Sequence, residues 1–330
     1  MRLLTRSDIQ RAISMRDTLT ILKRAFADLS TGRATVPPRI ALPEDKHDGV
    51  TLFMPAYLLA AEALAVKIVS VHQHNPARHL PLIHALLVLL DPATGEPLAA
   101  MEGGYLTALR TGAASGVATD LLARENSHVA AIFGAGAQAR TQLLAVAAVR
   151  PITRCWIYAR HPENVRRFIA EMQPQLGTTI ELMAATSPTQ AVREAHIICA
   201  ATSSGTPVFN GAELQPGTHL NAVGSFRSDL QEIDTTTLQR AAKIVIDQRE
   251  SAMAEAGDIL IALAQGAIQL TDIYGELGEI AAGLKPGRET EDEITYFKSV
   301  GNAVQDAAVA QAIYQHALRE NLGVDFDLLS

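Results

Sequence analysis

The segment VAAIFGAGAQARTQL, residues 129–143, joins a short apolar run to a pair of glycines and then to residues that can form a helix. Gly134, Gly136 and Ala139 give the spacing G-x-G-x-x-A. In a strand–turn–helix unit the first glycine permits a tight turn, and the second lets the backbone approach a pyrophosphate. The small third residue lets helix and strand pack closely, with the phosphates at the helix N-terminus. The segment therefore predicts a dinucleotide site, with a merely structural turn as the alternative.

The end of the following strand bears on which dinucleotide is bound. In NAD-binding proteins an acidic residue about 20 positions after the glycines binds the adenosine ribose hydroxyls. Here the strand CWIYA ends in Ala159, Arg160 and His161, with no acidic residue. Because Arg160 can face a 2′-phosphate, the sequence favours NADP. NAD stays possible, since Glu163 follows closely.

A lysine stands inside the apolar run ALAVKIVSV, residues 63–71. If this run is a strand, Ala65, Val69 and Val71 share a face with Lys67. Burial of an ammonium group lowers its pKa, so Lys67 can act as a general acid or base, or bind a carboxylate. An edge strand from which the side chain reaches solvent is the alternative interpretation.

Two arginines also lie in unusual surroundings. Arg110 belongs to YLTALRTGAASG, whose small residues indicate a helix that is buried nearly all round. A buried arginine requires a carboxylate or phosphate partner, supplied by a ligand or by an aspartate. Arg39 follows Pro37 and Pro38 in a loop that leads into a strand, where surface exposure is the default.

Four histidines, His72, His74, His79 and His84, lie close together in the sequence. Their spacing matches no ligand set of a helix or strand, and no cysteine or acidic pair accompanies them. The sequence therefore predicts no metal site here.

Composition excludes several classes of protein. The chain has 330 residues and a formal net charge of −7, which argues against nucleic-acid and anionic-membrane partners. The longest apolar stretch, residues 80–90, is too short to span a bilayer, and the charged N-terminal residues do not resemble a signal peptide. Two cysteines, Cys155 and Cys199, are too few for a disulfide framework, so we expect a reducing, cytoplasmic setting.

The first part of the chain is expected to form an α+β unit. Residues 7–30 have the pattern of one amphipathic helix that Ser7 can cap. Three β-rich segments follow, at 50–58, 63–72 and 83–91, and the turn-like DPATGEP (91–97) is expected to connect two strands of a hairpin.

From residue 129 onward apolar runs alternate with helical patterns, which is typical of a parallel sheet covered by helices on both faces. A last helical segment is expected over 291–319, packed back on the first part. The predicted fold is therefore α/β, with a Rossmann-type doubly wound sheet (116–299) and a smaller α+β domain for substrate binding and dimerisation (1–115 with 300–330).

Seven motifs in this order, PPRI, AVKIV, DPATGEPLA, LTALRTGAAS, GAGAQA, HLNAVGS and FKSVGNAVQD, resemble the ornithine cyclodeaminase/μ-crystallin family across nearly the whole chain. The resemblance implies a homodimer that transfers a hydride between NAD(P) and the α-carbon of an amino or imino acid. It assigns the substrate carboxylate to Arg39, Lys67 and Arg110, and proton transfer to Lys67. It assigns the pyrophosphate to Gly134, Gly136, Ala137 and Gln138, beside Ala139. It places Thr202, Val223, Ser225 and Ser299 on the nicotinamide side, with Val300 near the substrate.

Three positions depart from patterns found within this family. Leu82 stands where many members have a threonine near the cofactor. Leu52 replaces a glutamate of true cyclodeaminases, and Phe226 replaces an aspartate shared by cyclodeaminases and archaeal alanine dehydrogenases. Phe226 would then offer an apolar wall to a small ring, and Asp229 a rim contact or a partner for Arg227. The pattern resembles the ketimine reductase branch.

The expected reaction is therefore the NAD(P)H-dependent reduction of the C=N bond of an α-imino acid, often cyclic, such as Δ1-pyrroline-2-carboxylate. Arg39 and Arg110 would fix the carboxylate, and Lys67 would supply the proton. Three alternatives stay open: an open-chain amino acid dehydrogenase or imino acid reductase, an ornithine cyclodeaminase, and a protein that binds NADP without turnover.

Overall fold

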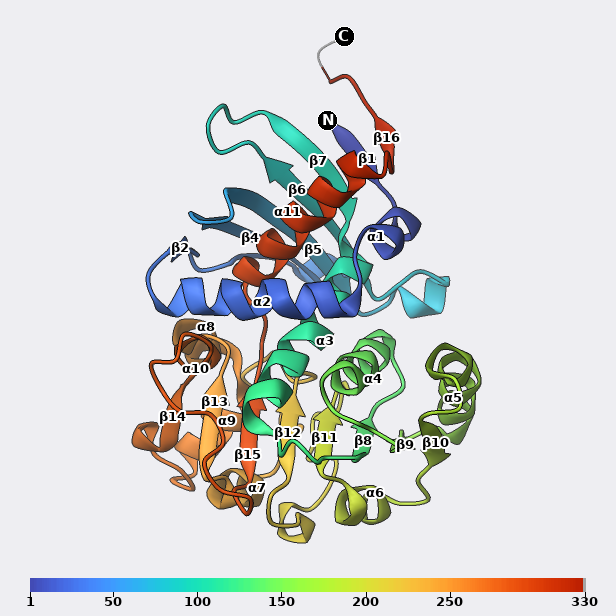
Figure 1. Cartoon of the computed structure of the whole chain (residues 1–330), viewed down its shortest axis with the longest axis vertical. Helices are drawn as coiled ribbons and strands as arrows, with labels where there is room; N and C mark the ends of the chain where they lie inside the picture. The colour runs from blue at the N-terminus through green and yellow to red at the C-terminus, as the bar shows by residue number, and fades with distance from the viewer. Residues whose placement is uncertain (329–330) are drawn as a thin grey trace. The chain divides into compact units, whose positions relative to one another are not determined.

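The computed structural model describes residues 1–328, and the chain divides into two units (Figure 1). Unit 1 comprises Met1–Arg110 together with the chain from Asn302 onward. Unit 2 comprises Thr111–Gly301 and is therefore inserted into unit 1 along the sequence. Helix α3 (Gly103–Leu122) includes the residues at which the first unit ends and the second begins.

Unit 1 combines a largely antiparallel sheet with helices. The strands follow the order β16-β1-β7-β6-β5-β4-β2, and β3 also pairs with β4. The elements of this unit besides α3 are β1 Arg2–Leu4, α1 Arg6–Ala12, α2 Met15–Ser30, β2 Ala34–Thr35, β3 Ile40–Glu44, β4 Gly49–Leu58, β5 Ala63–His72, β6 Ile83–Leu90, β7 Pro97–Glu102, α11 Ala303–Arg319 and β16 Val324–Asp325.

The three expected β segments are confirmed as β4, β5 and β6, which are antiparallel neighbours. The expected hairpin is confirmed as well. Asp91 accepts hydrogen bonds from the backbone N–H groups of Ala93 and Thr94, at 2.7 and 3.1 Å, in the turn that joins β6 to β7. Helix α11 lies across this sheet beside α2, so that alternate residues of β5, including Lys67, are buried (Figure 1).

The prediction of one helix over residues 7–30 is wrong, because two capping sequences divide the segment. Thr5 and Asp8 form a capping box at the start of α1, and Ser14 and Asp17 form another at the start of α2. In each box, side-chain oxygens accept hydrogen bonds from backbone N–H groups at the start of a helix. In one continuous helix the carbonyl groups of the preceding turn would accept these bonds instead. Ser7 accordingly lies within α1 and caps nothing there.

Unit 2 is built on a parallel sheet with the strand order β10-β9-β8-β11-β12-β15-β13-β14. Its elements are β8 Val129–Phe133, α4 Ala137–Val149, β9 Arg154–Tyr158, α5 Pro162–Leu176, β10 Glu181–Ala184, α6 Pro188–Glu194, β11 Ile197–Ala200, β12 His219–Ala222, α7 Thr235–Arg240, β13 Lys243–Ile246, α8 Arg249–Glu255, α9 Gly257–Ala264, β14 Ile273–Glu276, α10 Leu277–Ala281 and β15 Thr295–Lys298.

Strand β8 shows why both faces of this sheet are covered. Ala131 and Phe133 belong to an apolar core with residues of α6, α7 and α9, whereas Ala130 and Ile132 belong to another with residues of α4 and α5. A strand that is buried on both faces needs apolar residues at every position rather than at alternate ones. The predicted Rossmann-type doubly wound sheet is confirmed.

The prediction of a helix over 291–319 is correct only for its second part. Residues Thr295–Lys298 form strand β15, which lies between β12 and β13, and helix α11 begins at Ala303. The run TYFK favours a strand because aromatic and β-branched residues suit a buried sheet. The expected packing of the helix on the first part of the chain is confirmed, since α11 contacts β4 and β5.

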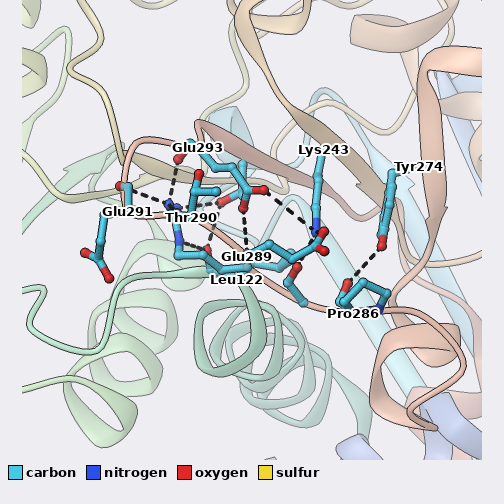
Figure 2. Close-up of polar contacts among 11 residues, drawn as sticks. Leu122, Lys243, Tyr274, Pro286, Glu289, Thr290, Glu291 and Glu293 are labelled. Atoms are coloured by element: carbon cyan, nitrogen blue, oxygen red, sulfur yellow. Dashed lines mark hydrogen bonds and ion pairs between the residues drawn. The ribbon is translucent and has the colours of Figure 1, made fainter.

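Two cations, the buried Lys243 and the half-buried Arg288, make hydrogen bonds at the amino-terminal edge of the sheet in unit 2 (Figure 2). Lys243, the first residue of β13, donates to the carbonyl of Gly287 and to Glu289. Arg288 donates to the carbonyls of Leu122 and Glu293, both at 2.7 Å. These bonds tie the loop that precedes β15 to the first residue of β13 and to the last residue of α3.

Among residues 1–328 no helix is both long and apolar enough to cross a membrane.

Candidate active site

The side chain of Lys67 lies on the buried face of β5 and meets an aspartate of α11. Nζ of Lys67 donates to Oδ2 of Asp306 at 2.7 Å, and each side chain is 2% exposed. The alternation expected for β5 is confirmed, because Ala65, Val69 and Val71 are buried on the same face. The ammonium is thus held among apolar side chains by one carboxylate.

Arg110 of helix α3 shares that carboxylate. Its Nε donates to Oδ1 of Asp306 at 2.9 Å, and its Nη1 donates to Oε1 of Gln305 at 2.8 Å. Two cations therefore face one anion in a buried setting, which leaves a net positive charge where an anionic ligand would be stabilised. These two bonds use Nε and Nη1, and Nη2 is the guanidinium nitrogen through which a carboxylate ligand can pair with Arg110.

The charges of this cluster oppose one another in setting the pKa of Lys67. Burial lowers this pKa, and the carboxylate of Asp306 raises it. The guanidinium groups of Arg110 and Arg39 lower it further, and the resulting pKa is about 8. Arg39, which directly precedes β3 and is half-buried, is thus within electrostatic range of the cluster.

Asp306 remains ionised in spite of its burial. Burial raises the pKa of this carboxyl group, but Arg110 and Lys67 outweigh that effect, and the pKa lies below its ordinary value. A lysine that exchanges its proton near neutral pH beside an arginine has the properties of a proton donor next to a carboxylate binder.

The glycine loop of unit 2 has the backbone geometry that a dinucleotide requires. Gly134 has a φ of 108°, and a Cβ at this position would overlap the carbonyl oxygen of Ala201. Gly136 is the N-cap of α4 and has no side chain with which to cap the helix. A Cβ at this position would meet nothing within 4 Å, so the space in front of the helix is open. The first N–H groups of α4 are thus approachable by a phosphate.

Other residues of the loop fit the same interpretation. Oε1 of Gln138 is buried and has no hydrogen-bond partner among the described residues, so a ligand can supply one. Ala137 is exposed at the start of α4, and Ala139 is fully buried against the core that contains Ala130. This loop therefore fits the pyrophosphate of a dinucleotide.

Arg160 lies two residues beyond β9 and is exposed. The loop that carries Gly134 reaches the same region, since the N–H of Gly134 donates to the carbonyl of Tyr158, the last residue of β9, at 2.8 Å. Glu163 is also exposed, in the first turn of α5, 3.6 Å from His161. Both an arginine and a glutamate are thus available near the end of β9.

The residues expected on the nicotinamide side follow three strands of unit 2. Thr202 follows β11, Val223 and Ser225 follow β12, and Ser299 with Val300 follows β15. Ser225, Ser299 and Val300 are buried, at 1%, 2% and 9% exposure. Since the sheet is parallel, these positions share its carboxyl-terminal edge, where open α/β sheets bind ligands.

Phe226 and Asp229 lie in the loop after β12 and are both exposed, Phe226 at 40%. Asp229 accepts hydrogen bonds from Nε and Nη2 of Arg227, at 2.9 and 2.6 Å, which realises one of the two arrangements expected for it. This bond lowers the pKa of Asp229. Leu52, in β4, lies on the face of the sheet that contains Met54, the cross-strand partner of Lys67.

His72, His74 and His84 surround one hollow of about 310 Å³ together with His47 and Arg78. Two of them face carboxylates instead of each other: His72 lies 3.4 Å from Glu44, and His74 lies 3.5 Å from Asp48. Among residues 1–328 no three histidine, cysteine or acidic side chains are arranged to hold a metal ion.

Four acidic or amide side chains near these sites were not predicted from the sequence: Asp306 and Gln305, which hold Arg110, and Glu232 and Asp247, at the carboxyl-terminal edge of the sheet in unit 2. A signal for Asp306 is present, because it is the only charged residue in the apolar run NAVQDAAVA. Like Lys67, Asp306 is a lone charged residue among mainly apolar neighbours. Glu232 and Asp247 carry no such signal, since other charged residues stand within three positions of each.

Known proteins share both the sequence and the fold of this chain. A Δ1-pyrroline-2-carboxylate reductase of Bacillus cereus is 38% identical over 323 residues, which are 98% of each chain. The structure of Thermococcus litoralis Δ1-pyrroline-2-carboxylate reductase in complex with NADH and L-proline matches with a TM-score of 0.95 at 45% identity, covering 99% of this chain and all of the other.

An archaeal alanine dehydrogenase dimer with bound NAD matches with a TM-score of 0.92 at 36% identity, covering 100% of this chain and 99% of the other. The model of the ornithine cyclodeaminase/mu-crystallin family matches residues 1–321. The chain therefore belongs to the ornithine cyclodeaminase/mu-crystallin family.

Proposed function

We propose that this protein is an oxidoreductase that reduces the C=N bond of a cyclic α-imino acid, such as Δ1-pyrroline-2-carboxylate, to the L-amino acid with NAD(P)H. The observation that carries the proposal is the pairing of Lys67 and Arg110 on Asp306, which offers a proton donor next to a carboxylate binder. The full-length similarity to Δ1-pyrroline-2-carboxylate reductases supports the same reaction.

In this proposal Arg110 and Arg39 bind the carboxylate of the substrate. Arg110 is held by Asp306 and Gln305 through Nε and Nη1, so its plane is fixed before the substrate arrives. Such preorganisation avoids the loss of side-chain entropy on binding and orients the imine carbon.

Lys67 delivers the proton to the imine nitrogen. A protonated imine is more electrophilic at carbon, so proton transfer and hydride addition assist each other. With a pKa of about 8, the ammonium is mostly protonated at neutral pH and gives up its proton readily. Asp306 stays ionised throughout and stabilises the charged forms of both cations.

The cofactor is bound by unit 2 through Gly134, Gly136, Ala137 and Gln138 at the pyrophosphate. When bound, the reduced nicotinamide supplies the hydride. We assign NADPH as the preferred form, because β9 ends without an acidic residue and is followed by Arg160, whose guanidinium can pair with a 2′-phosphate. Use of NADH through Glu163 is the outcome that would oppose this assignment.

The protein is further proposed to be a homodimer. In the sheet of unit 1, Ile40, Phe53, Ile68 and Leu86 are cross-strand partners and form one apolar row on the face opposite Lys67. Ile40 is 60% and Leu86 45% exposed. A contiguous exposed apolar surface on a sheet is typical of a subunit interface, and the alanine dehydrogenase named above is a dimer.

A cytoplasmic location is proposed from the cysteines. Cys155 and Cys199 are both unpaired and buried, which suits a reducing compartment.

The experiment that tests the reaction is an assay of cofactor oxidation with three sets of substrates. The purified chain is supplied with NADPH or NADH and Δ1-pyrroline-2-carboxylate, and separately with pyruvate plus ammonia. Ornithine plus NAD tests cyclodeamination, which leaves the cofactor unchanged after each turnover, so the ammonia released is measured in that case. Oxidation with the cyclic imine, well above that with pyruvate and ammonia, is the expected result. Activity confined to the other two assays would assign an open-chain dehydrogenase or a cyclodeaminase instead, and no activity in any would leave a binding protein.

A further inference from the structure

Three buried carboxylates lie at the carboxyl-terminal edge of the sheet in unit 2 and have no part in the reaction described above. Glu232, Asp247 and Asp258 are each 0% exposed. A buried carboxylate is costly unless hydrogen bonds and counter-charges offset its desolvation. The groups that satisfy these three therefore show which segments they hold.

Glu232 connects the loops that follow β11 and β12. Its Oε1 accepts the backbone N–H of Thr202 at 2.6 Å, and its Oε2 accepts that of Gly224 at 2.9 Å. A Cβ on Gly224 would overlap the carbonyl oxygen of Thr202, so the two loops are in direct contact. One side chain thus sets the distance between two loops from different strands.

Asp247 directly follows β13 and holds the turn after β15. Its Oδ2 accepts three hydrogen bonds, from Oγ of Ser299 at 2.8 Å, from the N–H of Val300 at 3.0 Å and from the N–H of Gly301 at 2.7 Å. Gly301 has a φ of 77°, in the left-handed region that glycine adopts most easily. The carboxylate therefore fixes both the backbone and the one hydroxyl of this turn.

Asp258 links these two arrangements. Its Oδ1 accepts the N–H groups of Glu232 and Ile233, at 2.6 and 3.0 Å, and its Oδ2 accepts Nζ of Lys298 at 2.5 Å. Lys298 is the last residue of β15. Burial raises the pKa of Glu232, and the ammonium of Lys298 opposes that rise. A continuous polar network thus runs from the loop after β11 to the end of β15.

The segments held by this network carry Thr202, Val223, Ser225 and Ser299. We propose that Glu232 and Asp247 are positioning residues that hold these segments in the arrangement that binds the nicotinamide half of the cofactor. This inference rests on the proposed function, because it assumes a nicotinamide dinucleotide. The ionic contact between Lys243 and the exposed Glu289 lies at the opposite, amino-terminal edge and has no such relation to the ligand-binding edge of the sheet (Figure 2).

If Glu232 and Asp247 position only the nicotinamide side, their loss should weaken the whole dinucleotide but not a fragment that lacks nicotinamide. Binding measurements can test this without any assay of turnover. Glu232→Gln and Asp247→Asn keep the size of each side chain but turn one acceptor oxygen into an NH2 group that faces N–H donors. Calorimetric titration compares NADH with ADP-ribose, and NADPH with 2′-phospho-ADP-ribose. We expect each variant to weaken the dinucleotide at least about tenfold, with less than about a twofold change for the fragment without nicotinamide.

Asp234→Asn is the matched control. The carboxylate of Asp234 also accepts three hydrogen bonds, from Gly211 and Thr237, but it holds the start of α7. We expect the Asp234→Asn variant to have the same ratio of dinucleotide affinity to fragment affinity as the wild type. This should hold even if its melting temperature falls as much as that of Asp247→Asn.

Equal weakening of both ligands, or of neither, would overturn the positioning role. A wild-type chain that binds neither dinucleotide would overturn it as well, together with the proposed function. A wild-type chain that binds NADH or NADPH with a higher affinity than the fragment, yet reduces no imine, would contradict only the reaction.

Discussion

Nζ of Lys67 lies 2.7 Å from Oδ2 of Asp306, although the two residues are 239 positions apart in the sequence. The same carboxylate binds Arg110 at 2.9 Å, so one negative charge is shared between two positive ones. Asp306 therefore does more than cancel a charge. It holds the pKa of Lys67 above the value that burial alone would give, and it leaves the guanidinium of Arg110 able to attract a carboxylate.

The pH dependence of kcat/KM for the imine should show a descending limb near pH 8. Lys67 must be protonated to donate its proton, and its pKa is about 8, so the active fraction decreases as the pH rises through that value. The measurement is kcat/KM at saturating cofactor across the alkaline range. A limb near the ordinary lysine value would contradict the role of this buried group.

Asp306→Asn extends the same prediction. Because the carboxylate raises the pKa of Lys67, its removal should move the descending limb to lower pH. The variant should also be less stable, since it leaves two buried cations without an anion. Asp325→Asn is a suitable control, because Asp325 pairs with Arg2 at the sheet edge and its loss should not shift the limb.

Lys67→Met removes the ammonium but keeps an unbranched chain in the apolar surroundings. We expect kcat to fall by about 100-fold or more, because a positioned proton donor contributes at least that factor. Cofactor affinity, measured by titration, should change little. Lys46→Met alters an exposed lysine of the same unit and should leave both quantities unchanged; comparable losses in the two variants would remove Lys67 from the mechanism.

Arg110→Lys keeps the positive charge but loses the planar group that can bind a carboxylate while it contacts Asp306. The KM for the imine should rise about tenfold or more, with a smaller change in kcat. Steady-state kinetics at saturating cofactor separates the two parameters. If KM stays constant, Arg110 serves only to hold Asp306.

Arg160→Ala tests the choice of cofactor. The KM for NADPH should rise about tenfold or more, and the KM for NADH should not, because only NADPH carries the 2′-phosphate. Arg154→Ala provides the comparison, since Arg154 is a partly exposed arginine at the other end of β9. Similar effects of Arg160→Ala on both cofactors would contradict the preference for NADPH.

Leu86→Asp should convert the proposed homodimer into monomers. A carboxylate placed at the β6 end of the apolar row would have to be desolvated in the interface, where nothing offsets that cost. Sedimentation or light scattering reports the mass in solution. Leu59→Asp, at an exposed leucine just beyond β4, should leave the mass as in the wild type. A wild-type monomer would refute the proposal outright.

The local features of this chain could be predicted from its sequence. The glycine loop and the buried face of β5 depend on residues within a few positions of one another, so both can be recognised in the sequence. The failure at residues 7–30 is also local: Thr5 with Asp8 and Ser14 with Asp17 are capping signals that the apolar stripe obscured.

The substrate cluster could be predicted only in part. Lys67 and Arg110 are conspicuous because each is a cation in apolar surroundings, but their common partner depends on how α11 returns to the sheet. No local pattern contains that information. The same reason applies to Glu232 and Asp247, whose partners are backbone N–H groups of other loops. Every residue except proline has such a group, so the sequence does not indicate which of them binds a given carboxylate.

The insertion of unit 2 between the two parts of unit 1 has a consequence for synthesis on the ribosome. Lys67 and Arg110 emerge long before Asp306, and all of unit 2 is made in between. The nascent chain therefore carries two cations whose burial is unfavourable until the last helix arrives. Helix α11 is among the last segments to be made, and a chain truncated before it would contain every strand of unit 2 but lack the anion that holds Lys67 and Arg110.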